Sequence, residues 1–399
     1  MARPILSAST VVFFAYTGQF MAYPIIPFYI IRDLNGTPID IGLVLFVNLI
    51  LAAIFSVPMG ALSDRWGRKK VIFLGAAIAT IGYALLPFTQ STFQLMIVFG
   101  LAGLGHSAYG AGTVAYVSDI VSKKDAARGF GWTQISRNMS ISIGPAIGGF
   151  LAAIFGLASA FFVCALFLLI GALVTLVLIP SKIPGKVEEE GPKQEPSSQK
   201  TGMIKVLKDY VIIALLMSTF GYAFAILAYR GFIPLFAEGM QGTIIFDLAL
   251  PAYVGVLFSV QAGASILARI PLAKYSDKTG RRAPFVIIGL LLTALAIFLI
   301  ANTADVNLLI AWSALLGFAS SMGPAAGAVI LMERTGQKSR GATFGLNISS
   351  LYAGQAVGSI AMGGLIEVYG FQTGFLTVAA LLIGFSTIFL VTAIKMRLR

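Results

Sequence analysis

The run from Val71 to Ser118 contains no Asp, Glu, Lys or Arg, and only the polar stretch Pro87–Thr92 interrupts it. It is therefore long enough for two helices of the roughly 20 apolar residues that cross a bilayer. Comparable runs recur along the chain, which is 58% hydrophobic and only 11% charged. A water-soluble core cannot bury that much apolar surface, whereas in lipid the backbone polar groups are satisfied inside helices. The sequence therefore predicts an all-α membrane protein.

The apolar runs predict twelve transmembrane helices. Val71–Ser118 and Phe130–Ser181 each hold a pair. Residues 181–208 are rich in Pro, Gly, Ser and charge, which is typical of a flexible linker. We therefore predict an N-terminal six-helix bundle (1–180), a cytoplasmic linker (181–208) and a C-terminal six-helix bundle (209–399). The other eight helices are expected at Ser7–Ile31, Ile41–Leu62, Asp209–Ala237, Leu248–Ala273, Pro284–Asn302, Val306–Met332, Ala342–Ile366 and Phe371–Ile394.

The basic residues predict which side of the membrane each loop faces. If the N-terminus is cytoplasmic, the inner loops, linker and termini hold 24 of the 28 Lys and Arg residues, and Arg32 alone lies outside. Positive residues favour the cytoplasmic side, so we expect a multi-pass protein of the cytoplasmic membrane with both termini inside. The net charge of +12 is divided among these short clusters, so it does not form the basic face that binds nucleic acid.

One loop occurs twice. Residues Gly60–Lys70 are G-A-L-S-D-R-W-G-R-K-K, and a degenerate copy, A-K-Y-S-D-K-T-G-R-R, runs from Ala273 to Arg282. The aspartates of the two copies are 213 residues apart, and so are the glycines that follow them. A repeat at half the chain length predicts two similar bundles, with the substrate site between them near the bilayer midplane.

The residues of this loop suit a mechanical role. Gly60 would allow close helix approach, and Gly67 a tight turn. Asp64 could lie near a neighbouring helix N-terminus, and the loop arginines could make bidentate pairs with Asp119. Such contacts would latch the cytoplasmic side and break when the halves rock; the alternative is that the basic residues only anchor to anionic headgroups. The expected gating residues are Gly60, Asp64, Arg65, Gly67, Arg68, Asp119, Asp277, Lys278, Gly280, Arg281 and Glu333.

These loops resemble the signature loop between helices 2 and 3 of the major facilitator superfamily of secondary transporters. A second motif, S-I-S-I-G-P-A-I-G-G from Ser140 to Gly149, resembles the superfamily's antiporter motif, with Ser140 in place of its first glycine. The resemblance implies two six-helix bundles related by a pseudo-two-fold axis and a cavity that opens to each side in turn. It also favours export, often of lipophilic drugs, although Gly-Pro is also ordinary helix packing. The motif residues are Gly144, Pro145, Gly148 and Gly149.

The chain departs from the superfamily where cation exporters carry charge. The family's Arg in helix 4 corresponds to Phe99 if Gly103 is the motif glycine, and the acid that many members carry in helix 1 is missing. All sixteen Asp and Glu residues fall in loops, the linker or helix ends. We therefore do not expect proton exchange for a cationic drug. The candidates for cavity or coupling roles are Gln19, Tyr23, His106, Arg137, Tyr229 and Arg230.

Three of these candidates are ionisable groups with strong positional constraints. His106, the only histidine, could titrate near neutral pH or be a neutral, hydrogen-bonded imidazole. Arg137 should be paired, solvated by a cavity or snorkelling, and Arg230 should pair with Glu238 or snorkel. A cavity with fixed positive charge would favour neutral or anionic molecules over cations.

The sequence therefore predicts a secondary transporter that exports amphiphilic compounds, with His106 as the proton-linked group if transport is proton-coupled. The alternatives are an uptake carrier or uniporter for a neutral or anionic metabolite, and a non-transporting sensor on the same fold. With one His, one Cys and no buried carboxylate pair, the chain lacks most of the residue combinations that enzymes use for catalysis. The sequence also lacks the phosphate-binding loop of an ATP-driven pump. We expect no enzyme activity, cofactor or metal site, and a monomer whose partners are a small-molecule substrate, the lipid bilayer and protons.

The topology can be tested by cysteine labelling. Cys164 is replaced and Ser197→Cys places the only thiol in the predicted linker. A membrane-impermeant maleimide should label this thiol in inverted vesicles and not in intact cells, because the basic loops are expected to be cytoplasmic. Labelling of intact cells would reverse the assignment.

Overall fold

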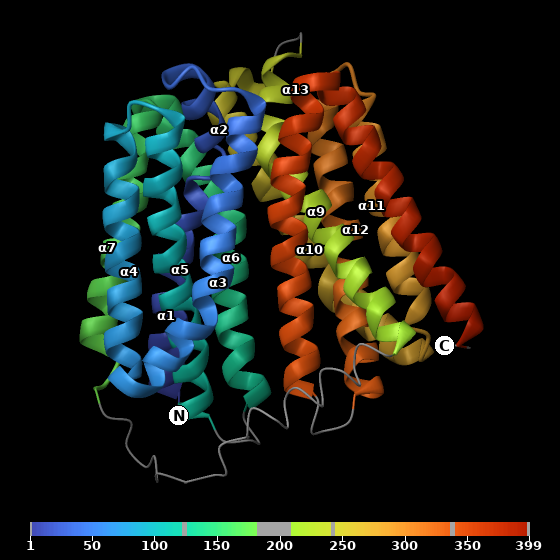
Figure 1. The fold of residues 1–399 in the computed structure, drawn as a ribbon, viewed down its shortest axis with the longest axis horizontal. Helices are drawn as coiled ribbons and strands as arrows, with labels where there is room; N and C mark the ends of the chain where they lie inside the picture. Colours follow the sequence, from blue (N-terminus) through green and yellow to red (C-terminus); the bar gives the residue numbers. More distant parts are fainter. Residues whose placement is uncertain (1, 122–125, 182–208, 241–243, 336–339, 397–399) are drawn as a thin grey trace. The chain divides into compact units, whose positions relative to one another are not determined.

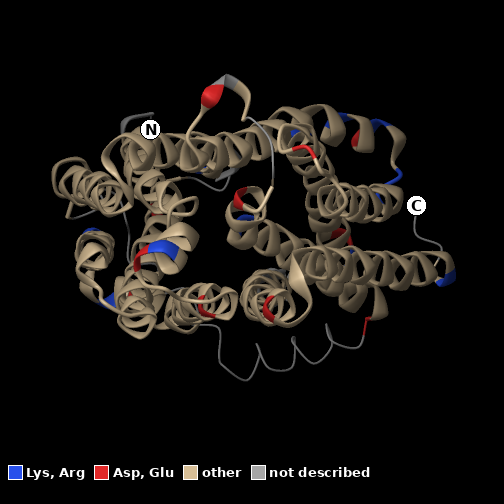
Figure 2. Cartoon of the chain, turned by 90° about the horizontal axis from the view of Figure 1, so that it is seen from above, with Lys and Arg blue, Asp and Glu red and all other residues tan. Residues whose placement is uncertain are grey.

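The computed structural model describes residues 2–121, 126–181, 209–240, 244–335 and 340–396. Every regular element in these ranges is helical (Figure 1). Charged residues occupy only a few points on the described ribbon (Figure 2). The predicted linker lies outside the described residues, except for Ser181.

The helices follow the apolar runs closely. In the first part of the chain they are α1 (Ala2–Met21), α2 (Ile26–Phe28), the π-helical turn η1 (Tyr29–Asp33), α3 (Pro38–Trp66), α4 (Arg68–Leu85), η2 (Leu86–Phe88), α5 (Thr92–Ile120), α6 (Ala126–Phe155) and α7 (Leu157–Leu178). In the second part they are α9 (Tyr210–Glu238), η3 (Ile245–Asp247), α10 (Leu250–Thr279), α11 (Ala283–Ala301), α12 (Leu308–Arg334) and α13 (Arg340–Lys395).

The described residues contain eleven segments that are long and apolar enough to span a membrane. The last of them, in α13, runs through Gly370, whose φ of 80° and ψ of 170° interrupt the helix. The predicted helices Ala342–Ile366 and Phe371–Ile394 lie on either side of this residue, and Figure 1 shows them as two arms that run in opposite directions. The prediction of an all-α membrane protein with twelve spans is confirmed.

The first predicted helix, Ser7–Ile31, is divided in the structure. The α-helix α1 ends at Met21, a turn follows, and helical structure resumes at Ile26. Pro24 and Pro27 cause the difference, because a proline has no N–H for the helical hydrogen bond and its ring collides with the preceding turn.

The chain forms two compact units. The first contains α1 to α7 together with residues 230–239 and 244–259, which are the end of α9 and the beginning of α10. The second contains residues 209–229, residues 260–279 and the helices α11 to α13. The unit boundary therefore passes through α9 between Tyr229 and Arg230.

Glycines bring the helices of the first unit into close contact. A Cβ atom at Gly75 would overlap the backbone N of Tyr109, and one at Gly103 would overlap the carbonyl of Asn48. The side-chain amide of Asn48 also donates a hydrogen bond to the carbonyl of Phe99 at 2.7 Å. Small residues and interhelical hydrogen bonds replace the hydrophobic driving force that lipid does not supply.

Gly370 should be indispensable for the reversal within α13. Within the described part of the chain, no neighbouring atom lies within 4 Å of the position of a Cβ there, so Gly370→Ala adds backbone strain alone, about 1–3 kcal/mol. We expect a lower temperature of thermal unfolding for the purified variant in detergent. Gly384→Ala is the matched control, since Gly384 lies in the same element with equally open space and Ala is the better helix former. Equal unfolding temperatures for the two variants would contradict this account.

Candidate functional site

The first repeated loop holds a compact charge cluster. Gly67 has a φ of 95° and is the only residue between α3 and α4, so α4 begins at Arg68. The Arg68 guanidinium contacts Asp64 at 2.5 Å and donates from Nε to Asp119 Oδ2 at 2.7 Å. The side chains of Arg68 and Asp119 are only 12% and 13% exposed. This pair joins the α3–α4 loop to the end of α5.

The second loop holds a looser cluster with a different arginine. Arg282 lies 3.7 Å from Asp277 and 3.3 Å from Glu333, and these two carboxylates are 69% and 58% exposed. Arg281, which the sequence places among the expected gating residues, is exposed and is not the arginine of this cluster. Two residues lie between Gly280 and the start of α11 at Ala283, whereas Arg68 follows Gly67 directly and begins α4.

The sequence contained a signal for this shift. Asp64 and Asp277 are 213 residues apart, but Asp119 and Glu333 are 214 apart. One extra residue therefore lies between the aspartate of the second loop and its acidic partner. Arg68 and Arg282 are also 214 residues apart, like their acidic partners Asp119 and Glu333.

Other expected loop residues have different surroundings from those predicted. Among the described residues, no atom lies within 4 Å of a Cβ placed at Gly60, so Gly60 does not mediate a close helix approach. Arg65 and Lys278 are exposed. Gly280 has a φ of 62°, the left-handed region that glycine adopts without strain.

The glycines of the second motif allow α6 to pack closely against two other helices of the first unit. A Cβ at Gly148 would overlap the carbonyl of Met21 in α1, and one at Gly149 would overlap the carbonyl of Pro251 in α10. From the α10 side, a Cβ at Gly255 would overlap the carbonyl of Pro145. Backbone meets backbone at these contacts, which only glycine allows.

Ser140 replaces the first glycine of the motif with a small hydrogen-bonding side chain. It is fully buried, and its Oγ accepts a hydrogen bond from Thr17 Oγ1 at 3.0 Å. The same Oγ lies 2.9 Å from the carbonyl of Phe13. Ser140 therefore joins α6 to α1 by polar contacts at a position where the family pattern has close packing.

Three aromatic rings stack along α1 and the turn that follows it, and we call them the aromatic ladder: Tyr16, Phe20 and Tyr23. The rings of Tyr16 and Phe20 are 6.2 Å apart at 20°, and those of Phe20 and Tyr23 are 5.4 Å apart at 22°. The Arg137 guanidinium carbon lies 5.0 Å from the centre of the Tyr16 ring, and that of Arg230 lies 5.8 Å from the Phe20 ring. Two arginines from α6 and α9 thus meet the same row of rings through cation–π contacts.

A network beside the ladder contains two further predicted residues. Gln19 accepts a hydrogen bond from the Tyr109 hydroxyl at 2.7 Å. His106 is 9% exposed and lies between Tyr83 and Tyr109, at ring distances of 5.8 and 5.6 Å. Among the described residues, its Nε2 has no hydrogen-bond partner.

Two expected partners are placed differently. Glu238 pairs with Arg32, whose Nη2 lies 2.7 Å from the carboxylate. It does not pair with Arg230, because eight residues separate the two along α9, a rise of about 12 Å. Tyr229 belongs to the second unit, where its hydroxyl lies 2.6 Å from Ser313 Oγ. The structure therefore gathers Gln19, Tyr23, His106, Arg137 and Arg230 in the first unit, without Tyr229.

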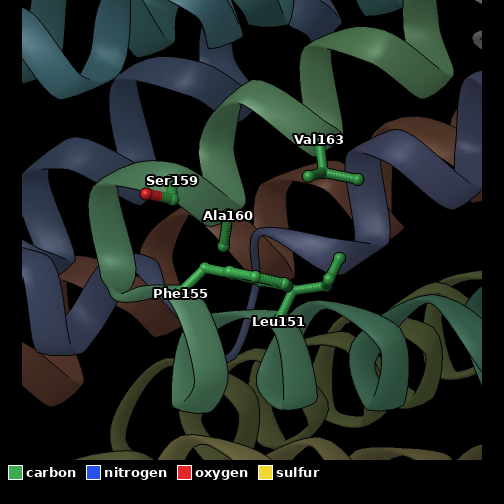
Figure 3. Close-up of a pocket in the computed structure, with 5 residues that line it drawn as sticks. All are labelled: Leu151, Phe155, Ser159, Ala160 and Val163. Carbon is green, nitrogen blue, oxygen red and sulfur yellow. The ribbon is translucent and has the colours of Figure 1, made fainter.

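A separate apolar pocket of about 340 Å³ lies where α6 turns into α7. Leu151 and Phe155 from α6 face Ala160 and Val163 from α7 (Figure 3). Its fifth lining residue is Ser159, so no charged side chain lines this pocket. Within the described ranges, no three His, Cys, Asp or Glu residues gather as a metal site requires.

Comparison with known families identifies the architecture. The profile of the Major Facilitator Superfamily matches residues 8–252 and 243–396, nearly the whole chain. The chain belongs to this superfamily. It is therefore a multi-pass membrane transporter of the superfamily and not an enzyme, and transporters of this kind bind small-molecule substrates.

Similar proteins include multidrug resistance proteins, a nucleoside transporter and a POT family transporter. The multidrug resistance protein MdtH of Yersinia enterocolitica is 21% identical over 88% of this chain and 83% of its own, and that of Yersinia pestis is 22% identical over the same shares. Among solved structures, a mutant of the nucleoside transporter NupG has a TM-score of 0.83 at 16% identity, covering 98% of this chain and 99% of its own. A POT family transporter in complex with 5-aminolevulinic acid has a TM-score of 0.82 at 14% identity, covering 98% and 96%. At these identities the structural likeness shows the fold alone.

The two charge clusters should differ in their contribution to stability. Arg68→Gln removes an ion pair in which both side chains are mostly buried, a loss that approaches the roughly 3 kcal/mol typical of broken buried pairs. Arg282→Gln should cost less than about 1 kcal/mol, because its partners are exposed. The measurement is the unfolding free energy of each purified variant in mixed micelles titrated with SDS. A larger loss for Arg282→Gln would contradict the assignment of the tighter cluster to the first loop.

Proposed function

We propose that this transporter exports amphiphilic small molecules from the cytoplasm by alternating access. The proposal rests on the close packing of α6, in which Gly148 and Gly149 contact the backbones of α1 and α10. At the two glycines themselves the contacts are held by dispersion, so separating them during a rocking motion breaks no hydrogen bond there, whereas Ser140 and Ser142 of the same helix donate hydrogen bonds to the carbonyls of Phe13 and Ser259. The export direction is supported by the resemblance of this motif to the antiporter motif and by the relatives named multidrug resistance proteins.

The proposed transport path includes the aromatic ladder and its two arginines. Neither α1 nor α6 contains an Asp or Glu, and the only one in α9, Glu238, contacts Arg32. The ionisable groups at the ladder are therefore positive, which favours neutral or anionic substrates over cations. If transport is coupled to protons, we propose His106 as the group that carries the proton.

The two charge clusters act in this proposal as latches on the cytoplasmic side. Each cluster joins the loop between two helices to the end of a third helix. The ion pairs of the Arg68 cluster are shorter than those of the Arg282 cluster. The first latch would therefore remain closed through more of the transport cycle than the second, and neutralising the exposed acids would alter the rate of exchange more than the fold.

Uptake of a polar metabolite is the alternative function. The network of Gln19, Tyr109 and His106 favours it, because these amide, phenol and imidazole groups could hydrogen-bond a polar substrate. The solved relatives that carry nucleosides or bind 5-aminolevulinic acid share the fold with this chain. Direction of flux distinguishes the two functions.

Flux in proteoliposomes of known orientation tests the proposal. Fluorescent amphiphiles of matched size and different charge are followed in both directions, with and without a proton gradient. We expect transport from the cytoplasmic side, slowed roughly two- to fivefold in the Asp64→Asn, Asp277→Asn double variant because two exposed ion pairs are lost. Asp305→Asn, a neutralised acid outside the latches, should leave the rate unchanged.

Three outcomes would oppose the proposal. Flux only toward the cytoplasmic side would favour uptake, and binding without flux would favour a sensor. A normal rate in the double variant would remove the latch role from the two aspartates.

A further inference from the structure

The guanidinium of Arg137 borders a small cavity in the first unit. The cavity has a volume of about 60 Å³ and lies between α1, α5 and α6. Its volume corresponds to roughly two water molecules, which is the size of an acidic head group and too small for an aromatic ring. The residues that determine its chemistry are Tyr16, Gly110, Thr113, Thr133, Gln134 and Arg137.

The polar groups of this cavity favour an anion. The hydroxyls of Thr113 and Thr133 donate to the carbonyls of Tyr109 and Phe130 on their own helices. Toward a guest they can therefore only accept hydrogen bonds, and the donors for an anion have to come from the other polar side chains. Arg137, Gln134 and Tyr16 are the other polar liners, and they bring N–H and O–H donors. The cavity therefore combines one fixed positive charge with neutral donors, and no carboxylate lines it.

The ring beside the cavity holds the arginine in place. Arg137 lies over the Tyr16 ring, and Tyr16 is in turn fixed by Phe20 and by an edge-to-face contact with Tyr109 at 5.4 Å. A ring face attracts a guanidinium but carries no net charge, so this contact orients Arg137 without neutralising it. A preorganised guanidinium loses little freedom when it binds a carboxylate.

The ladder continues from the cavity as an aromatic surface. Tyr16 and Tyr23 are half-buried, so part of each ring is open to a ligand, and their planes are nearly parallel to that of Phe20. A planar ring that extends from the cavity would meet these rings in offset-stacked or edge-to-face arrangements. Arg230 beside Phe20 adds a second positive charge along this path.

We propose that the cavity binds the carboxylate or sulfonate of a planar aromatic acid, with Arg137 as its ion partner and the ladder as the surface for the ring. The inference rests on the proposed transport function and names the class of substrate for it. Aromatic acids would then be preferred over neutral compounds of the same shape, and aromatic cations would be the poorest ligands.

Binding to the purified full-length protein in detergent tests this proposal with three probes that share one ring system. They are 1-naphthoate, 1-naphthylmethanol and 1-naphthylmethylammonium, and affinity is measured by titration calorimetry at pH 7. We expect naphthoate to bind tightest. Arg137→Gln should weaken naphthoate about 10- to 100-fold, the size of a lost charge-assisted hydrogen bond, and should leave naphthylmethanol unchanged.

A second variant tests the cavity without touching a charge. A Cβ at Gly110 would lie 3.5 Å from Tyr16 Oη, an ordinary contact, so Gly110→Ala fills part of the cavity and leaves the backbone undisturbed. It should weaken naphthoate and spare naphthylmethanol. Gly131→Ala in α6, where no described atom lies within 4 Å of the added atom, should change neither affinity.

The results separate this proposal from the transport function. Equal affinity for the acid and the alcohol, or unchanged naphthoate binding in both Arg137→Gln and Gly110→Ala, would overturn the head-group site even if amphiphiles are transported. Selective naphthoate binding by a protein that shows no flux would retain the site and overturn the transport function.

Discussion

The hydrocarbon interior of a membrane contains no water to satisfy backbone N–H and C=O groups, and the rest of this structure depends on that constraint. It makes every spanning segment helical, and it makes any interruption costly unless a neighbouring helix covers it. The first span is interrupted after Met21 because of its prolines, and Gly148 brings α6 against the Met21 carbonyl. The glycine–proline motif therefore lies beside an interrupted stretch of backbone in the first unit, where close packing and the hydrogen bonds of Ser140 both hold α6 to α1.

The same solvent confines charge to a few kinds of position. Acids lie at helix ends, where they form the clusters around Arg68 and Arg282. Two arginines within the spans lie over aromatic rings, Arg137 over Tyr16 and Arg230 over Phe20. A ring stabilises a cation without cancelling its charge. The first unit thus keeps a positive character along one face of α1, and this character is what the proposed preference for acids depends on.

The two halves of the chain show how a repeat can diverge while it keeps its design. Both loops place an arginine between two acids, but the second has an extra residue before its arginine, and its carboxylates are exposed. A buried ion pair is screened less than an exposed one. Equivalent ion pairs in the two halves can therefore differ in strength. In the proposed transport cycle, the weaker cluster around Arg282 would break before the stronger cluster around Arg68.

Much of the fold followed from the sequence alone. Composition and the length of the apolar runs determined the twelve spans, and Gly67 marked a tight turn because few other residues adopt its backbone angles. The spacing of Asp119 and Glu333 also records one extra residue between Asp277 and Glu333, whereas the reversal at Gly370 was seen only in the structure. The partners of side chains were not, because helical spacing shows which residues share a face and not which helix that face meets. Only the tertiary structure could show that Glu238 contacts Arg32, that Arg230 lies over Phe20, and that Arg137 borders a cavity beside Tyr16. These contacts join helices far apart in the chain, and close packing of whole helices, not local sequence, determines where they form.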